Sequence, residues 1–164
     1  MIQFATLDSS LGKFGIHTSK KEICQIFLPN SSSYQTMPRT PVEKQSSILK
    51  LALDELNQYF LGERRKFTVP FDLMLPPYFN KVLKAVSKIP FGHTASYQDI
   101  AVQTGNPKAV RAVGNANAKN PIPIIIPCHR VITSSGKLGG YGGGTDLKEM
   151  LLHHEGVNLL NSFT

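Results

Sequence analysis

The sequence predicts two domains, a small α/β domain over residues 1–74 and a mainly α domain over residues 75–164. Three observations predict this fold class. Two short β-forming runs lie near the start, helical spacing of apolar residues dominates the remainder, and a basic, proline-containing segment at 63–77 separates the halves. A chain of 164 residues is long enough for two small domains with their own cores.

The predicted α/β domain begins with strands at 13–17 and 21–28, joined by a short polar turn. Cys24 lies in the apolar second run, where a small buried core thiol is the ordinary role of a cysteine. Residues 30–41 are rich in Ser, Pro and polar side chains, which is typical of a loop.

A helix is expected to follow Pro41 and to stop at Gly62. Apolar residues recur along it at helical spacing and predict one core-facing stripe of Val42, Leu49, Leu53, Leu56 and Phe60. The basic turn that follows could contact phosphate, although exposed basic turns are more often only solvated. We therefore interpret residues 63–77 as a connection between domains.

The second half is predicted to open with a helix over 77–87, whose apolar face is formed by Phe79, Val82, Leu83 and Val86. Ser96 and Asp99 have the spacing of a capping box, which predicts a short helix reaching about Gln103. Residues 105–107 read Gly-Asn-Pro, so Gly ends this helix, while Asn caps and Pro begins the next.

This second short helix is expected to reach about Ala118. Two short helices joined by a glycine-containing turn are typical of a helix-turn-helix, but many such hairpins bind nothing. The net charge of +7 supports a polyanionic partner, and its distribution is uneven. From residue 75 onward there are nine Lys or Arg against four Asp or Glu, compared with nine against seven before it. A DNA contact is therefore better sought in the second half.

Composition excludes several classes of protein. Two cysteines do not make a disulfide framework, and no zinc-ligand spacing is present, so no metal is predicted. The start does not resemble a signal peptide, and the longest apolar run, residues 122–126, is too short to span a membrane. We therefore expect a cytoplasmic protein whose thiols stay reduced.

Cys128 is the candidate nucleophile. Prolines at 121, 123 and 127 predict an extended, stiff approach to Cys128, which His129 and Arg130 follow directly. Only the thiolate is nucleophilic, and a neighbouring imidazole or cation promotes its formation. Spacing alone leaves a catalytic and a buried structural cysteine equally open.

Five glycines at 139–144 predict a flexible loop that can approach a flat ligand closely. The loop lacks the Gly-Lys-Ser/Thr ending of a phosphate-binding loop, so no nucleotide cofactor is expected. Thr145 or Asp146 is expected to cap a final helix that ends at 155–156, with Leu147, Met150 and Leu151 facing inward. Glu155 could orient an imidazole, but taken alone it is more simply an exposed helix-end charge.

These segments, taken in order, resemble the O6-alkylguanine-DNA alkyltransferase family. The similarity runs from Phe91 to Val157 and includes Ser96-Tyr97-Gln98, Gly105-Asn106-Pro107-Lys108, Arg111-Ala112-Val113-Gly114, Asn120-Pro121, Pro127-Cys128-His129-Arg130, Tyr141 with its glycines, and His154-Glu155-Gly156. The first half matches mainly in length and in its strand-then-helix layout. The resemblance implies a ribonuclease-H-like α/β domain followed by a winged helix-turn-helix domain.

The resemblance further implies DNA repair by a single-turnover reaction. Cys128 would accept the alkyl group from O6 of guanine, with O4 of thymine left open, and would not be regenerated. His129 would activate Cys128 through water, Glu155 would polarise His129, and Asn120 would orient the active-site turn. The implied partner is double-stranded DNA carrying O6-alkylguanine, bound by a monomer that uses no cofactor.

Arg111 would fill the space of the extruded base, and Tyr97 would disfavour the local phosphate and donate a proton to guanine N3. The resemblance also implies DNA contacts by Ala112, Lys108 and Arg130, a base pocket of Val131, Tyr141 and Gly142, and support of the cysteine loop by Lys148. Two other functions stay open, a DNA-binding module with an inert cysteine and a cysteine hydrolase. The absence of an evident oxyanion-hole motif disfavours the hydrolase.

Overall fold

The computed structural model describes residues 1–159, and it divides into two compact units, Met1–Asp72 and Leu73 onward. The first unit is α/β and the second is mainly helical, which confirms the predicted fold class. No helix in the part of the chain described is long and apolar enough to cross a membrane.

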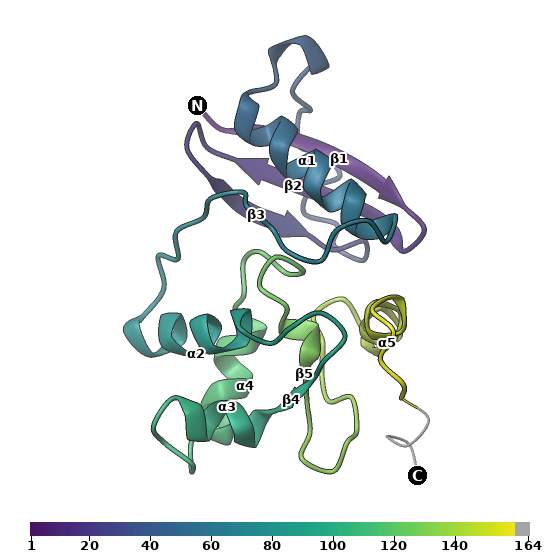
Figure 1. Cartoon of the computed structure of the whole chain (residues 1–164). Helices are drawn as coiled ribbons and strands as arrows, with labels where there is room; N and C mark the ends of the chain where they lie inside the picture. The colour runs from purple at the N-terminus through teal and green to yellow at the C-terminus, as the bar shows by residue number, and fades with distance from the viewer. Residues whose placement is uncertain (160–164) are drawn as a thin grey trace. The chain divides into compact units, whose positions relative to one another are not determined.

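The first unit is a three-stranded antiparallel sheet, β1 (Gln3–Ser9), β2 (Gly12–Thr18) and β3 (Ile23–Phe27), ordered as in the sequence. Helix α1 (Ser47–Phe60) lies across one face of the sheet (Figure 1). Sheet and helix share a core that includes Phe14, Ile16, Leu49 and Leu56. The first strand was not predicted, because polar residues interrupt its apolar pattern. Its hydrogen-bonded pairing with β2 forms the strand despite this composition.

The prediction that Cys24 is a buried core thiol is wrong, because its side chain is exposed. The pairing of β2 with β3 shifts between His17 and Thr18, which leaves Cys24 without a partner residue in the register. Such a bulge breaks the alternation of the strand, so that Ile23 and Ile26 face the core and Cys24 does not.

The single helix predicted after Pro41 is two elements. A 3-10 helix spans Val42–Lys44, and α1 begins only after Ser46, whose hydroxyl accepts a hydrogen bond from the Leu49 N–H at 3.2 Å. Val42 is therefore not part of the core stripe and is 73% exposed. The expected stop is confirmed, because the helix ends just before Gly62, which has φ +79°.

The segment after α1 is held by a carboxylate that the sequence did not single out. Glu55 is fully buried, and its oxygens accept hydrogen bonds from the N–H groups of Thr68 and Val69 at 2.7–3.0 Å. Arg64 Nη1 lies 2.7 Å from Glu55 Oε2. The basic turn thus supplies a cation to the interior of the first unit, in addition to its solvated residues.

The second unit contains four helices and a two-stranded parallel sheet in its described part. Its elements are α2 (Pro77–Ser87), β4 (Ala95–Ser96), α3 (Tyr97–Gln103), α4 (Val110–Ala118), a 3-10 helix (Cys128–Arg130), β5 (Val131–Ile132) and α5 (Thr145–His154). Strand β4 pairs with β5, and this pairing brings the start of α3 beside the residues that follow Cys128.

The predicted capping box is present. Ser96 Oγ accepts from the Asp99 N–H at 2.9 Å, and Asp99 Oδ2 accepts from the Ser96 N–H at 2.9 Å. The predicted start of the next helix is wrong. Asn106 holds the turn by accepting from the Lys108 N–H, and α4 begins only after Ala109. Helices α3 and α4 therefore form the expected pair, with a longer turn between them.

The expected extended approach to Cys128 is instead a compact buried turn. The Ile126 N–H donates to the Ile122 carbonyl at 3.0 Å, and Ile124 has a positive φ of +76°. Burial of the isoleucine side chains stabilises this folded path over the extended one that the prolines suggested.

Helix α5 also departs from its predicted details. It follows Gly144, without a side-chain cap from Thr145 or Asp146. Met150 is 43% exposed, whereas Lys148 is fully buried. The apolar pattern could not reveal this orientation, because a lysine holds an inward position of the helix. The predicted end is confirmed, with Glu155 at the helix terminus and Gly156 at φ +79°.

Candidate active site

Cys128 begins the 3-10 helix that follows the isoleucine turn, and its side chain is buried. Its N–H donates to the Ile126 carbonyl at 2.8 Å, and its own carbonyl accepts from Asn117 Nδ2 at 3.1 Å. Both bonds hold the backbone on either side of the thiol. The position of the sulfur is therefore set by α4 and by the turn before it.

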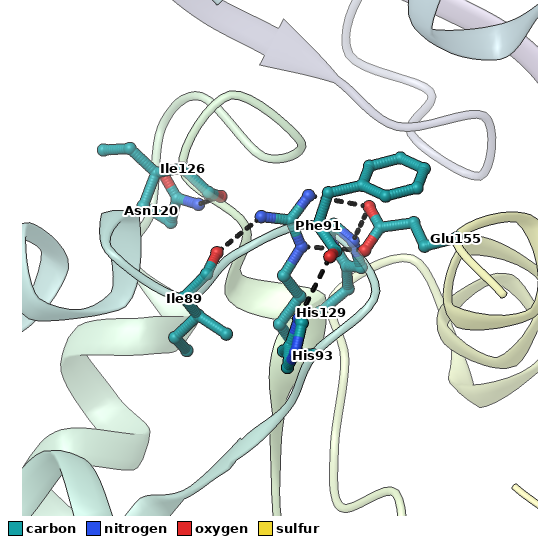
Figure 2. Close-up of polar contacts among 8 residues, drawn as sticks. Ile89, Phe91, His93, Asn120, Ile126, His129 and Glu155 are labelled. Carbon is teal, nitrogen blue, oxygen red and sulfur yellow. Dashed lines mark hydrogen bonds and ion pairs between the residues drawn. The ribbon is translucent and has the colours of Figure 1, made fainter. Parts of the chain in front are cut away.

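Asn120 closes that turn from inside. Its Nδ2 donates to the Ile126 carbonyl at 2.7 Å (Figure 2). Its Oδ1 accepts from the Ile122 N–H at 3.0 Å. The same side chain hydrogen-bonds the Cys128 thiol and favours its ionised form. This geometry supports the orienting role that the resemblance implied for Asn120.

Burial raises the pKa of the Cys128 thiol, while the Asn120 hydrogen bond and the charge of Lys148 oppose that effect without cancelling it. The resting cysteine is therefore a thiol at neutral pH. Its proton must leave when the sulfur reacts, so a nearby base is required.

His129 and Glu155 form a buried pair. His129 Nε2 lies 2.9 Å from Glu155 Oε2 (Figure 2). Burial alone raises the pKa of the Glu155 carboxyl, but the hydrogen bonds and charges of His129 and Arg130 outweigh it and hold the pKa well below its usual range. An ionised carboxylate can only accept, so the proton of the neutral ring lies on Nε2.

The second ring nitrogen, His129 Nδ1, is then the basic one. It is buried and has no hydrogen-bond partner among residues 1–159. Burial lowers the pKa of His129 and outweighs the opposing effect of Glu155, so the ring is neutral at physiological pH. A neutral, oriented imidazole one residue from the thiol has the state that a general base requires.

Arg130 does not occupy the position expected of a DNA contact. Its side chain is buried, with Nε 2.7 Å from Glu155 Oε1 and Nη2 2.9 Å from Glu155 Oε2. Its Nη1 donates to the Ile89 carbonyl at 2.7 Å. The guanidinium is thus directed into the protein, because the buried carboxylate and carbonyl need its donors.

Two tyrosines approach Cys128 from different segments. Tyr97 is the first residue of α3, and its pKa is raised by burial and by the charge of Cys128, although a hydrogen bond to Asn117 opposes this. Burial raises the pKa of Tyr141 well above its usual value, and the charge of Cys128 adds to the effect. Both phenols therefore keep their protons at neutral pH and can donate them.

Lys148 ties the glycine-containing loop to β5. Its Nζ donates to the carbonyls of Val131 at 2.6 Å and Gly140 at 3.2 Å, and also to that of Leu138. Burial lowers the pKa of Lys148 to about 8, while the charge of Cys128 acts in the opposite direction. The lysine therefore joins the strand after the active-site turn to the loop that carries Tyr141.

The residues expected at DNA occupy varied positions. Arg111 is exposed on α4, Ala112 is half-buried beside it, and Lys108 is exposed in the turn before the helix. Ala116, on the same helix, is buried. Gly142 is exposed, and a Cβ at that position would meet nothing within 4 Å.

Asn117 is a site residue that sequence reasoning missed. It is buried on α4, where it bonds the Cys128 carbonyl and the Tyr97 hydroxyl. One feature of the sequence could have indicated it. Asn117 is a polar residue at helical spacing from Val113, on the face of the helix where apolar core residues are expected. Among residues 1–159, no group of three or more His, Cys, Asp or Glu side chains could hold a metal ion.

Comparison with known families identifies both units. Residues 2–73 match the ribonuclease-like domain of 6-O-methylguanine DNA methyltransferase, and residues 77–157 match the DNA binding domain of the same family. The methylated-DNA–protein-cysteine methyltransferase of Mycobacterium bovis is 42% identical over 161 residues, which are 94% of this chain and 93% of the relative. The constitutive enzyme of Bacillus subtilis is 37% identical over 96% of this chain and 98% of its own.

Solved structures agree with this assignment. The Mycobacterium tuberculosis O6-methylguanine methyltransferase has a TM-score of 0.82 at 42% identity, covering 94% of this chain and 93% of that one. A structure of the Mycobacterium tuberculosis OGT protein in complex with DNA has a TM-score of 0.84 at 39% identity, covering 99% of each chain. The chain therefore belongs to the 6-O-methylguanine DNA methyltransferase family.

Proposed function

We propose that this protein repairs O6-alkylguanine in double-stranded DNA by moving the alkyl group irreversibly to Sγ of Cys128. The reaction class, methyl transfer from DNA to a protein cysteine, follows from the family. The observation that carries the proposal for Cys128 is its position, buried beside the Glu155–His129 pair and in the element that follows the helix pair α3–α4.

The proposed transfer is a single displacement. The bond from Sγ to the alkyl carbon forms while the bond from that carbon to guanine O6 breaks. The thiol proton passes through water to His129 Nδ1, and the departing guanine takes a proton at N3 from the Tyr97 hydroxyl. The proton held by His129 is then released to water, and the Tyr97 phenolate takes one back from water. The neutral state of His129 and the protonated state of the Tyr97 phenol are the states that these roles require.

The buried thiol requires that the target base leave the duplex. Arg111 is proposed to fill the space of the extruded base, because it is exposed on α4 and long enough to enter a base stack. Ala112 and Lys108 are proposed to contact DNA close by. Val131, Tyr141 and Gly142 are proposed to line the guanine pocket, with Lys148 holding its two walls together.

The partner is proposed to be duplex DNA, in line with the complex solved for the Mycobacterium tuberculosis relative. Action as a monomer, a cytoplasmic location and repair of O4-alkylthymine stay predictions. So does the absence of a cofactor, because the proposed transfer needs only a thiol, a base and an acid.

The proposal is tested with duplex DNA that contains O6-methylguanine labelled in its methyl group. One label per protein molecule, found on Cys128 by peptide mass spectrometry, is the expected result. Turnover beyond one label per molecule contradicts the single-use mechanism and favours a hydrolase. Binding without any transfer leaves only a DNA-binding module.

The matched variants are Cys128→Ala and Cys24→Ala. The first is expected to abolish transfer and to keep DNA affinity, since Cys128 faces the interior of the protein. The second is expected to transfer normally, because Cys24 is exposed in the first unit. Loss of folding in Cys128→Ala would instead assign that residue a structural role.

A further inference from the structure

Two side chains in the second unit, Arg130 and His129, share the buried carboxylate of Glu155. Glu155 accepts two hydrogen bonds from Arg130 and one from His129, and all three side chains are at most 6% exposed. The guanidinium is further held by the Ile89 carbonyl and lies 5.8 Å from the centre of the Phe91 ring. Arg130 is therefore fixed on three sides.

The charges on Glu155 and Arg130 affect the protonation state of His129. A buried carboxylate that faces only an imidazole favours protonation of that imidazole, because burial of an unpaired anion is costly. An imidazolium cannot take the thiol proton from Cys128. A permanent cation on the same carboxylate removes the need for a second one, since a guanidinium keeps its charge in proteins.

We propose that Arg130 is a positioning residue of the alkyl transfer, which fixes and neutralises the Glu155 carboxylate so that His129 is oriented by it without being protonated. The inference rests on the proposed function of Cys128. It replaces the DNA contact expected of Arg130 with a role inside the protein. Arg130 acts through Glu155 and His129 and touches no substrate.

The other charged groups around His129 agree with this assignment. Glu155 raises the pKa of His129, while Arg130 and Lys148 lower it. Cys128 is the residue before His129 in the chain. The charge of Glu155 also raises the pKa of Tyr141. Lys148 donates its hydrogen bonds to backbone carbonyls, whereas Arg130 contacts the Glu155 carboxylate directly.

The experiment measures single-turnover transfer from O6-methylguanine duplex DNA across the pH range in which imidazole titrates. Arg130→Met is expected to slow transfer at neutral pH by about 10-fold to 100-fold, because only part of the general-base contribution, typically about 100-fold to 10,000-fold, is lost. On acidification, the transfer rate of this variant is expected to begin to fall at a higher pH than that of the wild type. The reason is that the pKa of His129 rises when Arg130 no longer neutralises the carboxylate. Affinity for duplex DNA is expected to be unchanged.

Arg130→Lys tests the charge separately from the geometry. A lysine keeps the positive charge but loses the two-point contact with the carboxylate. The transfer rate of this variant should therefore be intermediate, and it should fall on acidification at nearly the same pH as the wild-type rate. The matched control is Arg64→Met, which removes the arginine from the buried Glu55 of the first unit. That variant should be less stable but keep the wild-type pH profile.

The outcomes separate the two proposals. If wild-type protein transfers no label to Cys128, the proposed function fails. If wild type transfers and Arg130→Met has the same profile, or a uniformly lower rate with no shift, the positioning role is wrong. A loss of DNA affinity would restore the DNA-contact role. If Arg130→Met does not fold, Arg130→Lys and the imidazole signal of His129 by NMR decide the question.

Discussion

The two units each bury one glutamate, and the two carboxylates differ in their partners. Glu55 accepts from two backbone N–H groups, the Thr68 hydroxyl and Arg64. Glu155 accepts from Arg130 and from an imidazole. Backbone donors cannot change their charge near neutral pH, whereas an imidazole can.

The same residue type thus acts as a fixed clamp in one unit and as part of a proton-handling group in the other. Burial and an arginine partner are common to both sites and do not distinguish them. The distinguishing features are a titratable partner, His129, and a nucleophile next to it in the chain. In this protein, the buried ion pair that includes a group titrating near neutral pH is the one that lies beside the candidate nucleophile.

The largest expected difference is in transfer rate. Glu155→Gln is expected to slow methyl transfer by about 100-fold or more, because an amide neither fixes the Nε2 proton nor balances an imidazolium. Glu55→Gln should leave the rate unchanged at temperatures where both variants are folded. Single-turnover assays on the same duplex measure both rates, and equal slowing would remove the distinction between the two sites.

The second difference is in stability. Glu55→Gln is expected to lower the free energy of unfolding by about 2–4 kcal/mol, because the amide has a single acceptor oxygen for the donors of Thr68, Val69 and Arg64 and no charge to pair with the Arg64 guanidinium. Urea denaturation with Thr68→Val as a companion measures it. A loss below about 0.5 kcal/mol would contradict the clamp, since that is the range of ordinary surface substitutions.

The third prediction separates chemistry from DNA binding. Arg111→Ala is expected to slow repair of duplex DNA about 10-fold, by the loss of about 1–2 kcal/mol of support for the extruded base. Reaction with free O6-benzylguanine should be much less affected, since no base must leave a stack. Glu155→Gln should slow both reactions alike. Equal slowing of both by Arg111→Ala would argue against the extrusion role.

The smallest expected effect is the pH dependence of stability. The pKa of Glu155 is held below its usual range in the folded protein, so its carboxylate contributes stability that is present above the unfolded value of about 4.3. This contribution is lost as the pH falls below that value. Unfolding of wild type and Glu155→Gln from neutral to acid pH measures it, and the variant should show the flatter curve.

Many local elements were predictable from the residues. The capping box of Ser96 and Asp99, the bounds 77–87 of α2 and the stop at Gly62 depend on interactions between near neighbours in sequence. The first strand was missed because its partner, β2, supplies the pairing that its own composition does not indicate. The bulge that exposes Cys24 likewise depends on the register of two strands.

By itself, the sequence determined the order of the domains, the helix pair before the nucleophile and the identity of Cys128 and His129 as candidates. Only the tertiary structure decided which partners they have. It turned Arg130 inward, buried Lys148 on α5 and brought Glu155 to His129 across 26 positions of chain. The physical reason is that a charged side chain is buried only where donors or acceptors from distant segments form hydrogen bonds with it. Sequence spacing does not specify which distant segments come together.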